Sequence, residues 1–289
     1  MERAVFITKI NQLRHFKESY TRLYFGQEFC ERLIPSPGDL KEVLTFIRQK
    51  GMDFSLVTPY VTNLGLEKLN SLLDVLKKKE ANCEIIINDW GVLNLVNRRY
   101  VNLTPVLGRL LTKQKRGPRL IELLKRKTKS QFFKNPRDSK KKYLVFQKKL
   151  PLDSDFYYKG SNASSVPIIH DFLLRQRIRR IELDNTGQGL FLELPKGRIQ
   201  ASVYLPYVYI TTTFFCLSAG CDQKNKTPLK IKSCSKQCQK YVFKLRHKTM
   251  PKVIYLKGNS QFYKSPMFQL ENLQNSGVDR IVYEPEIPV

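Results

Sequence analysis

Four of the six cysteines lie close together, in the pattern Cys216-x4-Cys221-x12-Cys234-x3-Cys238. In a helix, Cys234 and Cys238 would lie on the same face one turn apart, so that their sulfur atoms come near each other. Cysteines at these spacings ligate zinc or an iron–sulfur cluster. We therefore expect residues 216–238 to form a cysteine-rich metal-binding loop, and the spacing alone leaves a 4Fe–4S cluster and zinc as open alternatives.

Three cysteines differ in their expected surroundings. Cys30 follows a short apolar strand, so a loop at the end of that strand could bring it to the same metal site. Cys216 stands between Phe215 and Leu217, and its alternative role is that of an inert, buried side chain. Cys83 begins a strand and is expected in the core, not at a metal.

Short apolar strands alternate with amphipathic helices along the chain. Strands are expected at residues 23–25, 54–57, 84–87, 100–103, 180–183, 201–205, 208–211, 253–256 and 280–283, and helices at 39–49, 65–79, 90–97 and 168–176. This alternation predicts parallel β-α-β units. A chain of 289 residues fits one TIM-like (β/α) barrel, complete or distorted, and no glycine-rich phosphate loop supports a nucleotide-binding fold. We expect a single α/β domain over residues 1–289.

Polar side chains follow most of the expected strands, where the active sites of barrel enzymes are built. They are Gln27, Glu28, Tyr60, Asn88, Asp89, Glu182, Asp184 and Asn185. Asp89 and Glu182 are the preferred catalytic pair. For each of these residues, a helix cap or a turn is the structural alternative.

The chain is strongly basic, with 51 Lys and Arg against 25 Asp and Glu and a net charge of +26. Residues 113–149 hold 15 Lys and Arg against two acids, and residues 222–252 hold ten against one. Burying so many ammonium groups would be costly, so residues 113–149 are expected to form an exposed basic insertion. Its lysines, with Phe132, Phe133 and Tyr143, suit RNA through phosphate neutralisation and base stacking, and a solvated loop is an equal alternative.

Three segments resemble one protein family. They are Leu23-Tyr24-Phe25-Gly26-Gln27-Glu28-Phe29-Cys30, the strand Ile85-Ile86-Ile87-Asn88-Asp89-Trp90-Gly91-Val92-Leu93, and the array Cys221-x12-Cys234-x3-Cys238. With them the chain resembles the collagenase-like peptidase U family, number thirty-two in its class, nearest to the accessory proteins for anaerobic ubiquinone hydroxylation. The resemblance covers residues 23–97 and 180–289 and is weak between them. It implies an α/β barrel that often carries a 4Fe–4S cluster.

By this resemblance, the cluster ligands would be Cys30, Cys221, Cys234 and Cys238. Other branches of the family have a further cysteine before the second ligand, at a wider spacing than that between Cys216 and Cys221. Cys30 and Cys216 therefore compete for the fourth position. The resemblance also implies oxygen-independent hydroxylation or RNA modification, with a related family member as a hetero-partner.

Two further functions remain as alternatives: a collagenase-like peptidase, and a zinc-stabilised RNA-binding barrel without catalysis. The sequence has three histidines and neither His-Glu-x-x-His nor Gly-x-Ser-x-Gly, so no standard protease motif supports a peptidase. No signal peptide is visible, and the uncharged stretch 201–221 contains Pro206 and several polar residues, which indicates buried strand and not a membrane span. We therefore expect a cytoplasmic protein with reduced cysteines.

Overall fold

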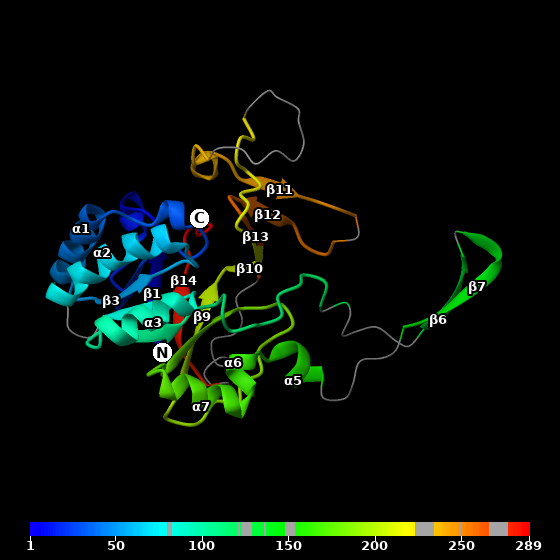
Figure 1. Cartoon of the computed structure of the whole chain (residues 1–289), viewed down its shortest axis with the longest axis horizontal. Helices are drawn as coiled ribbons and strands as arrows, with labels where there is room; N and C mark the ends of the chain where they lie inside the picture. Colours follow the sequence, from blue (N-terminus) through cyan, green and yellow to red (C-terminus); the bar gives the residue numbers. More distant parts are fainter. Residues whose placement is uncertain are drawn as a thin grey trace.

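The computed structural model describes residues 1–79, 83–120, 122, 129–135, 137–147, 154–222, 234–248, 250–265 and 277–289. The chain forms a closed barrel of parallel strands (Figure 1), in the order β1-β14-β9-β8-β5-β4-β3-β2. The barrel strands are β1 Glu2–Ile7, β2 Arg22–Gly26, β3 Asp53–Val57, β4 Glu84–Ile87, β5 Thr104–Leu107, β8 Arg180–Asp184, β9 Gln200–Leu205 and β14 Val278–Tyr283. The predicted α/β barrel is confirmed, and it closes because β1 pairs with both β2 and β14.

Helices cover the outside of the barrel (Figure 1). They are α1 Pro37–Lys50, α2 Asn63–Lys79, α3 Trp90–Arg99, α5 Ser154–Lys159, α6 Asn162–Ser165 and α7 Pro167–Arg175, with short 3-10 turns η1 Ile10–His15, η2 Glu31–Leu33 and η3 Gln237–Gln239. Helix α1 shows why these segments are helical. Ser36 and Asp39 form a capping box at its start, and its buried face carries apolar residues at helical spacing, from Leu40 to Ile47.

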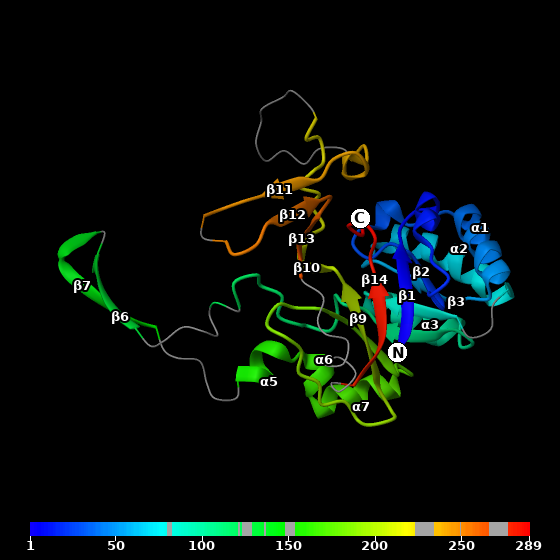
Figure 2. The same ribbon diagram turned by 180° about the vertical axis from the view of Figure 1, so that it is seen from behind.

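A second, antiparallel sheet is inserted between β9 and β14. Its strands are β10 Tyr207–Thr212, β11 Phe243–Leu245, β12 Ile254–Lys257 and β13 Ser260–Lys264, in the order β10-β13-β12-β11. Because β10 continues directly from β9, this sheet lies beyond the carboxyl end of the barrel (Figure 2). The strands expected at 208–211 and 253–256 exist, but they belong to this sheet and not to the barrel.

The uncharged stretch 201–221 consists of β9, β10 and a turn, as expected. None of the helices in the described ranges combines the length and apolar character needed to cross a bilayer.

One expected barrel strand is wrong. Residues 100–103 form a turn, and the strand follows at β5. The Tyr100 hydroxyl donates to Asp74 Oδ1 at 2.7 Å, so this residue packs outward against α2 instead of entering the sheet. Pro105 obscured the true strand because proline cannot donate a hydrogen bond to a neighbour.

The barrel has two apolar regions. The larger one fills the space between strands and helices and includes Leu44, Leu73 and Cys83, which confirms the predicted core position of Cys83. The smaller one fills the barrel interior and consists of Ala4, Phe6, Tyr24, Val57, Ile86, Val106, Tyr204 and Val282. The interior is therefore a packed core, as is usual for eight-stranded barrels.

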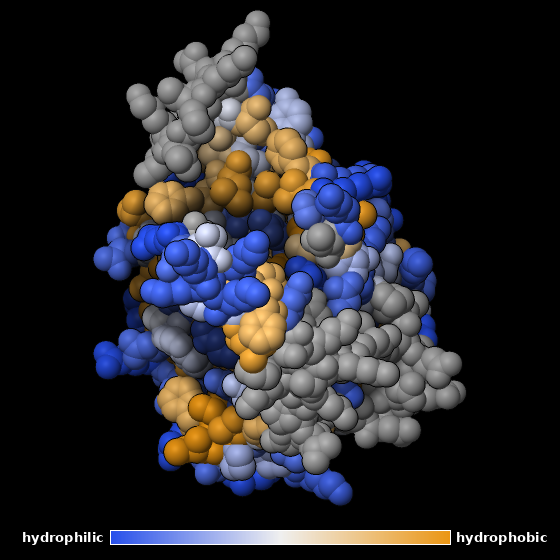
Figure 3. Space-filling model, turned by 90° about the vertical axis from the view of Figure 1, so that its right-hand side faces the viewer, coloured by the Kyte–Doolittle hydropathy of each residue, from blue (hydrophilic) through white to orange (hydrophobic). Residues whose placement is uncertain are grey.

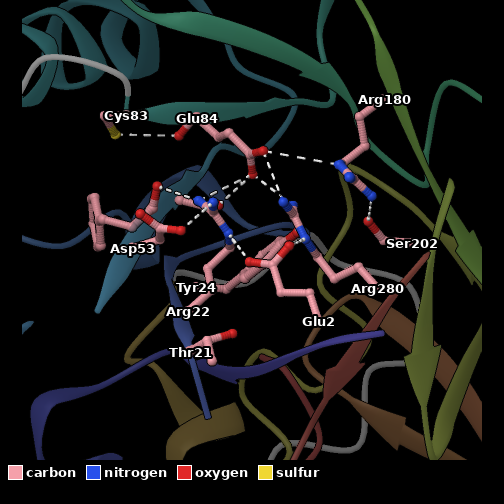
Figure 4. Close-up of polar contacts among 12 residues, drawn as sticks. Glu2, Thr21, Arg22, Tyr24, Asp53, Cys83, Glu84, Arg180, Ser202 and Arg280 are labelled. Atoms are coloured by element: carbon pink, nitrogen blue, oxygen red, sulfur yellow. Dashed lines mark hydrogen bonds and ion pairs between the residues drawn. The ribbon is translucent and has the colours of Figure 1, made fainter. Parts of the chain in front are cut away.

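A ring of ion pairs closes the amino-terminal end of the barrel (Figure 4). Arg280 donates to Glu84 at 2.7 and 3.0 Å and to Glu2 at 2.6 Å. Arg22 donates to Glu2 at 2.6 Å and to Asp53 at 3.0 Å. Burial opposes the ionisation of Glu84, but the hydrogen bonds and charges of Arg280 and Arg22 outweigh it and lower the pKa of this carboxyl. These contacts join strands β1, β2, β3, β4 and β14.

We expect Glu84→Gln to lower the free energy of unfolding by about 3–5 kcal/mol, because it leaves buried guanidinium groups without their counter-charge. Urea denaturation at pH 7 would measure the loss. Asp53→Asn is the matched control: its side chain is 69% exposed at the edge of the same ring, so it should cost less than about 1 kcal/mol. Equal effects of the two substitutions would contradict the central position of Glu84.

Candidate metal centre

Arg109 lies at the centre of the barrel mouth, two residues after β5, and is fully buried. Its Nη1 donates to Asp184 Oδ1 at 3.0 Å and its Nη2 donates to Glu284 Oε1 at 2.7 Å. Its Nε donates to both carboxylate oxygens of Glu28, at 3.2 and 3.1 Å. Glu28 follows β2, Asp184 ends β8 and Glu284 follows β14. One cation thus joins the ends of strands from different sides of the barrel.

Arg116 supplies the second cation of this group. It donates from Nε to Asp184 Oδ2 and from Nη2 to the Arg109 carbonyl, the latter at 2.6 Å. Burial raises the pKa of Glu28 and raises that of Glu284 well above its usual range, although Arg109 opposes both changes. Three carboxyl groups balance two guanidinium groups when one carboxyl holds a proton. Glu284 is best placed to hold it, since its Oε2 is buried without a hydrogen-bond partner among the described residues.

Gly108 makes this position of Arg109 possible. A Cβ atom on Gly108 would lie 2.2 Å from Asn88 Oδ1. The Asn88 amide crosses the mouth at that point, donating to the Thr58 carbonyl at 2.9 Å and accepting the Leu110 N–H at 3.1 Å. The close approach fixes the loop that begins with Arg109.

Cys30 and Cys238 lie among other cysteines. The pKa of Cys30 is raised to about 11, chiefly by burial and to a smaller extent by the thiols of Cys238, Cys234 and Cys216. The pKa of Cys238 is also raised, first by burial and then by Cys216 and Cys234. Such interactions require the thiols to lie near one another. Cys30, Cys216, Cys234 and Cys238 are thus electrostatic neighbours in the structure.

The turn between β12 and β13 holds the loops that carry these thiols. Asn259 Nδ2 donates to the carbonyls of Phe29 and Thr213, at 2.6 and 2.8 Å, and to the Tyr60 hydroxyl at 2.8 Å. Phe29 directly precedes Cys30, and Thr213 directly follows β10 on the way to Cys216. One side chain therefore joins the loops after β2, β3 and β10.

Gly258, in the same turn, lies against Cys238. Its φ of +64° lies in the left-handed region, and a Cβ there would lie 3.3 Å from the Cys238 Cβ and 3.8 Å from its Sγ. Next to it, burial lowers the pKa of Lys257 to about 8, and the Lys257 ammonium donates to the Ile287 carbonyl at 2.8 Å. The turn thus places the buried ammonium of Lys257 and the side-chain-free backbone of Gly258 beside the Cys238 thiol.

Cys221 is the remaining cysteine of the array. Cys221 is exposed, and its backbone N–H donates to the Ser218 carbonyl at 3.3 Å. Residues 223–233 of the predicted loop lie outside the described residues. Within those that are described, no three His, Cys, Asp or Glu side chains already have the geometry to hold a metal ion. Metal ligation by these cysteines stays a prediction.

The predicted catalytic pair is held in two separate networks. Asp89 caps α3, accepting the backbone N–H groups of Gly91 and Val92 at 2.6 and 3.2 Å, which is the structural alternative weighed for it. Glu182 lies inside the barrel, fully buried, and accepts the Tyr24 hydroxyl at 3.0 Å. A catalytic role for either residue stays a prediction.

The sequence analysis missed Arg109, Arg116 and Glu284. Arg109 and Glu284 follow strands, so the signal that singled out Glu28 and Asp184 also applied to them. Arg116 was hidden in the basic run of residues 113–149, which was expected to be exposed. That boundary needs correction, because residues 114 and 116 are each only 6% exposed and line the barrel mouth.

No protein-family model matches the chain, and no curated protein matches it. Among solved structures, the U32 peptidase Mk0906 is similar with a TM-score of 0.45 and 9% identity, over 100% of this chain and 94% of that one. The human pseudo-chitinase YKL-39 has a TM-score of 0.36 and 9% sequence identity, over 98% of this chain and 91% of that one. The Trichuris suis chitinase TsES1 has a TM-score of 0.37 and 8% identity, over 97% of this chain and 91% of that one. These are distant likenesses, and none says what this chain does.

We expect Arg109→Gln to lower the free energy of unfolding by about 3–5 kcal/mol, because it leaves three carboxyl groups buried without their cation. Denaturation in urea measures the effect. Arg14→Gln is the control, since Arg14 pairs with Glu286 at 2.9 Å but is 64% exposed, and its loss should cost less than about 1 kcal/mol. A similarly small effect at Arg109 would show that the mouth does not depend on it.

Burial raises the pKa of Glu182 from its ordinary 4.5 to about 7. Between these values the folded state keeps a proton that the unfolded state has lost, so this group's contribution to stability falls as the pH rises through that window. Glu182→Gln cannot ionise. The wild type should therefore lose roughly 2–4 kcal/mol of unfolding free energy relative to this variant as the pH rises from 4.5 to 7.5. Parallel stability curves for the two proteins would refute the buried, protonated state.

Proposed function

We propose that this chain binds a 4Fe–4S cluster at the barrel mouth through Cys30, Cys216, Cys234 and Cys238. The observation that supports this most is that one turn contacts the loops of three of these cysteines: Asn259 donates to the carbonyls of Phe29 and Thr213, which precede Cys30 and Cys216, and Gly258 lies against Cys238. The pKa of Cys30 is also raised in part by the thiols of Cys238, Cys234 and Cys216. Four thiolates are the usual ligand set of such a cluster. The family resemblance supports three of the four and names Cys221 in place of Cys216.

The donor set and its surroundings suit a thiolate-ligated centre. The thiols must lose their protons when a metal binds, and a nearby cation favours that loss. Burial raises the pKa of Cys238, and the buried ammonium of Lys257 opposes that change. Gly258 leaves room beside the sulfur, where any side chain would approach it.

A bound 4Fe–4S cluster would supply one-electron transfer at the mouth of the barrel. The chain's own residues would set its position: Asn259 joins the loops that carry Cys30 and Cys216, and Arg109 holds the loop after β2 through Glu28. The reaction we propose is the oxygen-independent hydroxylation or RNA modification that the family resemblance implies, and that part of the proposal rests on the resemblance.

Protein purified and reconstituted without oxygen should bind about four iron and four sulfide per chain and absorb broadly at about 400 nm. Cys30→Ser, Cys216→Ser, Cys234→Ser and Cys238→Ser should each lose most of the iron. Cys221→Ser should keep it and serves as the matched control, because it removes a thiol of the same array that is exposed.

Two results would count against this proposal. Loss of iron in Cys221→Ser, with retention in Cys216→Ser, would show that the ligand set is the one implied by the resemblance. Stoichiometric zinc in place of iron, in protein prepared with both metals present, would show a structural zinc site instead.

A further inference from the structure

A β-hairpin projects from the molecule between β5 and β8. It consists of β6 Lys129–Asn135 and β7 Asp138–Gln147, which pair with each other as a two-stranded sheet of their own. Figures 1 and 2 show it far from α1 and α2, at the end of a long excursion. A hairpin of two strands without a core to pack on has little stability of its own. The side chains on its two faces therefore indicate whether it has another role.

Aromatic side chains are exposed on both faces of this hairpin. Directly opposed residues of an antiparallel pair share a face, and the register opposes Phe132 to Leu144 and Phe133 to Tyr143. Their exposed fractions are 66% for Phe132, 47% for Phe133 and 54% for Tyr143. Neither face therefore covers an apolar core, and the rings are available to a partner.

Positive charge accompanies the Phe132 ring on one face of the hairpin. The register places Lys134 directly opposite Lys142, next to the Phe132 and Leu144 pair. Like charges in opposed positions destabilise a hairpin, so this pair works against the fold in the absence of an anion. Phe132, Phe133, Lys134 and Lys142 together line a hollow of about 460 Å³.

We propose that the hairpin is a binding arm for single-stranded RNA, whose bases stack on Phe132 and Phe133 and whose phosphates pair with Lys134 and Lys142. Stacking on exposed rings beside basic side chains is how proteins hold single strands, whose bases are unpaired. In a duplex the base faces are covered by their neighbours. An acidic protein would neutralise the lysines but leave the rings without a matching surface.

The charge of the surrounding segment and the surface around the arm agree with this occupant. Residues 113–149 carry 15 Lys and Arg against two acids. Figure 3 views the molecule from the side toward which the hairpin projects and shows hydrophilic and hydrophobic side chains next to one another on that face. A polyanion with flat, apolar bases matches that mixture of charge and rings.

The first experiment measures the anisotropy of a fluorescent twelve-nucleotide oligouridine as full-length protein is added. Lys134→Glu/Lys142→Glu should weaken binding roughly tenfold or more and reduce the slope of log K against log salt by about 1.4, the value for two phosphates on a single strand. This double variant keeps two like charges opposed, so the hairpin's own pairing is matched. Lys41→Glu/Lys68→Glu, on the exposed faces of α1 and α2, makes the same charge change away from the arm and should change affinity little.

Lys134→Glu alone separates binding from folding. It replaces a repulsive cross-strand pair with an attractive one, so it should stabilise the hairpin and still weaken oligouridine binding. Unchanged or tighter binding by this variant would overturn the proposal. Equal weakening by the helix variant would show that only the net charge of the protein matters, and would overturn it as well.

The second experiment tests stacking. Phe132→Ala should weaken oligouridine binding by roughly five- to hundredfold, and Phe132→Trp should restore it. An RNA duplex of twelve base pairs should bind more weakly than the single strand. Equal affinity for duplex and single strand, no effect of Phe132→Ala, or tenfold tighter binding of twelve-nucleotide oligothymidine would each contradict single-stranded RNA as the occupant. Iron content should stay unchanged in all these variants, so the outcome is independent of the cluster.

Discussion

The buried guanidinium of Arg109 is the interaction on which the upper half of the molecule depends. It has no exposed surface and contacts carboxyl groups that follow or end β2, β8 and β14. A cation in that position would be strongly destabilising without those partners. Because β2 and β14 flank β1 while β5 and β8 lie on the other side of the barrel, the contacts tie opposite walls together. Glu28 stands two residues before Cys30, so the same contacts also set the start of the thiol-bearing loop.

Charge is arranged in two layers with an apolar layer between them. The lower layer, around Glu84 and Arg280, lies where barrel strands begin, an end at which residues serve stability. The upper layer, around Arg109, lies where active sites of barrels are built, yet its groups are too deeply buried to meet a substrate. Glu182 stands between the two layers with the hydroxyl of Tyr24 as its donor. The turn at Asn259 lies beyond Arg109, where it joins the loops after β2, β3 and β10.

Much of the barrel could be predicted from the sequence because strand and helix periods are local properties. Helix α1 is an example, since its caps and its buried face are read directly from neighbouring residues. The position of Cys30 in the loop after β2 was also anticipated, because it follows a short apolar strand in the sequence. Arg109 and Arg116 could not be assigned in this way, because a buried cation is defined by partners far apart in sequence. The separate sheet of β10 to β13 was missed for a similar reason: the strand pattern of β10 and β12 is that of any strand, and only pairing shows which sheet they join.

β14 is synthesised long after the strands between which it fits. It pairs with β1 on one side and β9 on the other, so the barrel stays open along one side until residues 278–283 have left the ribosome. Until then the edges of β1 and β9 lack their neighbour, and unpaired strand edges in a nascent chain invite association with other chains. The inserted sheet, with every cysteine of the array, emerges before that closure. Closure of the barrel is thus late, and a chain that stalls between residues 238 and 278 would carry all the proposed ligands without Glu284, the last carboxyl that Arg109 needs.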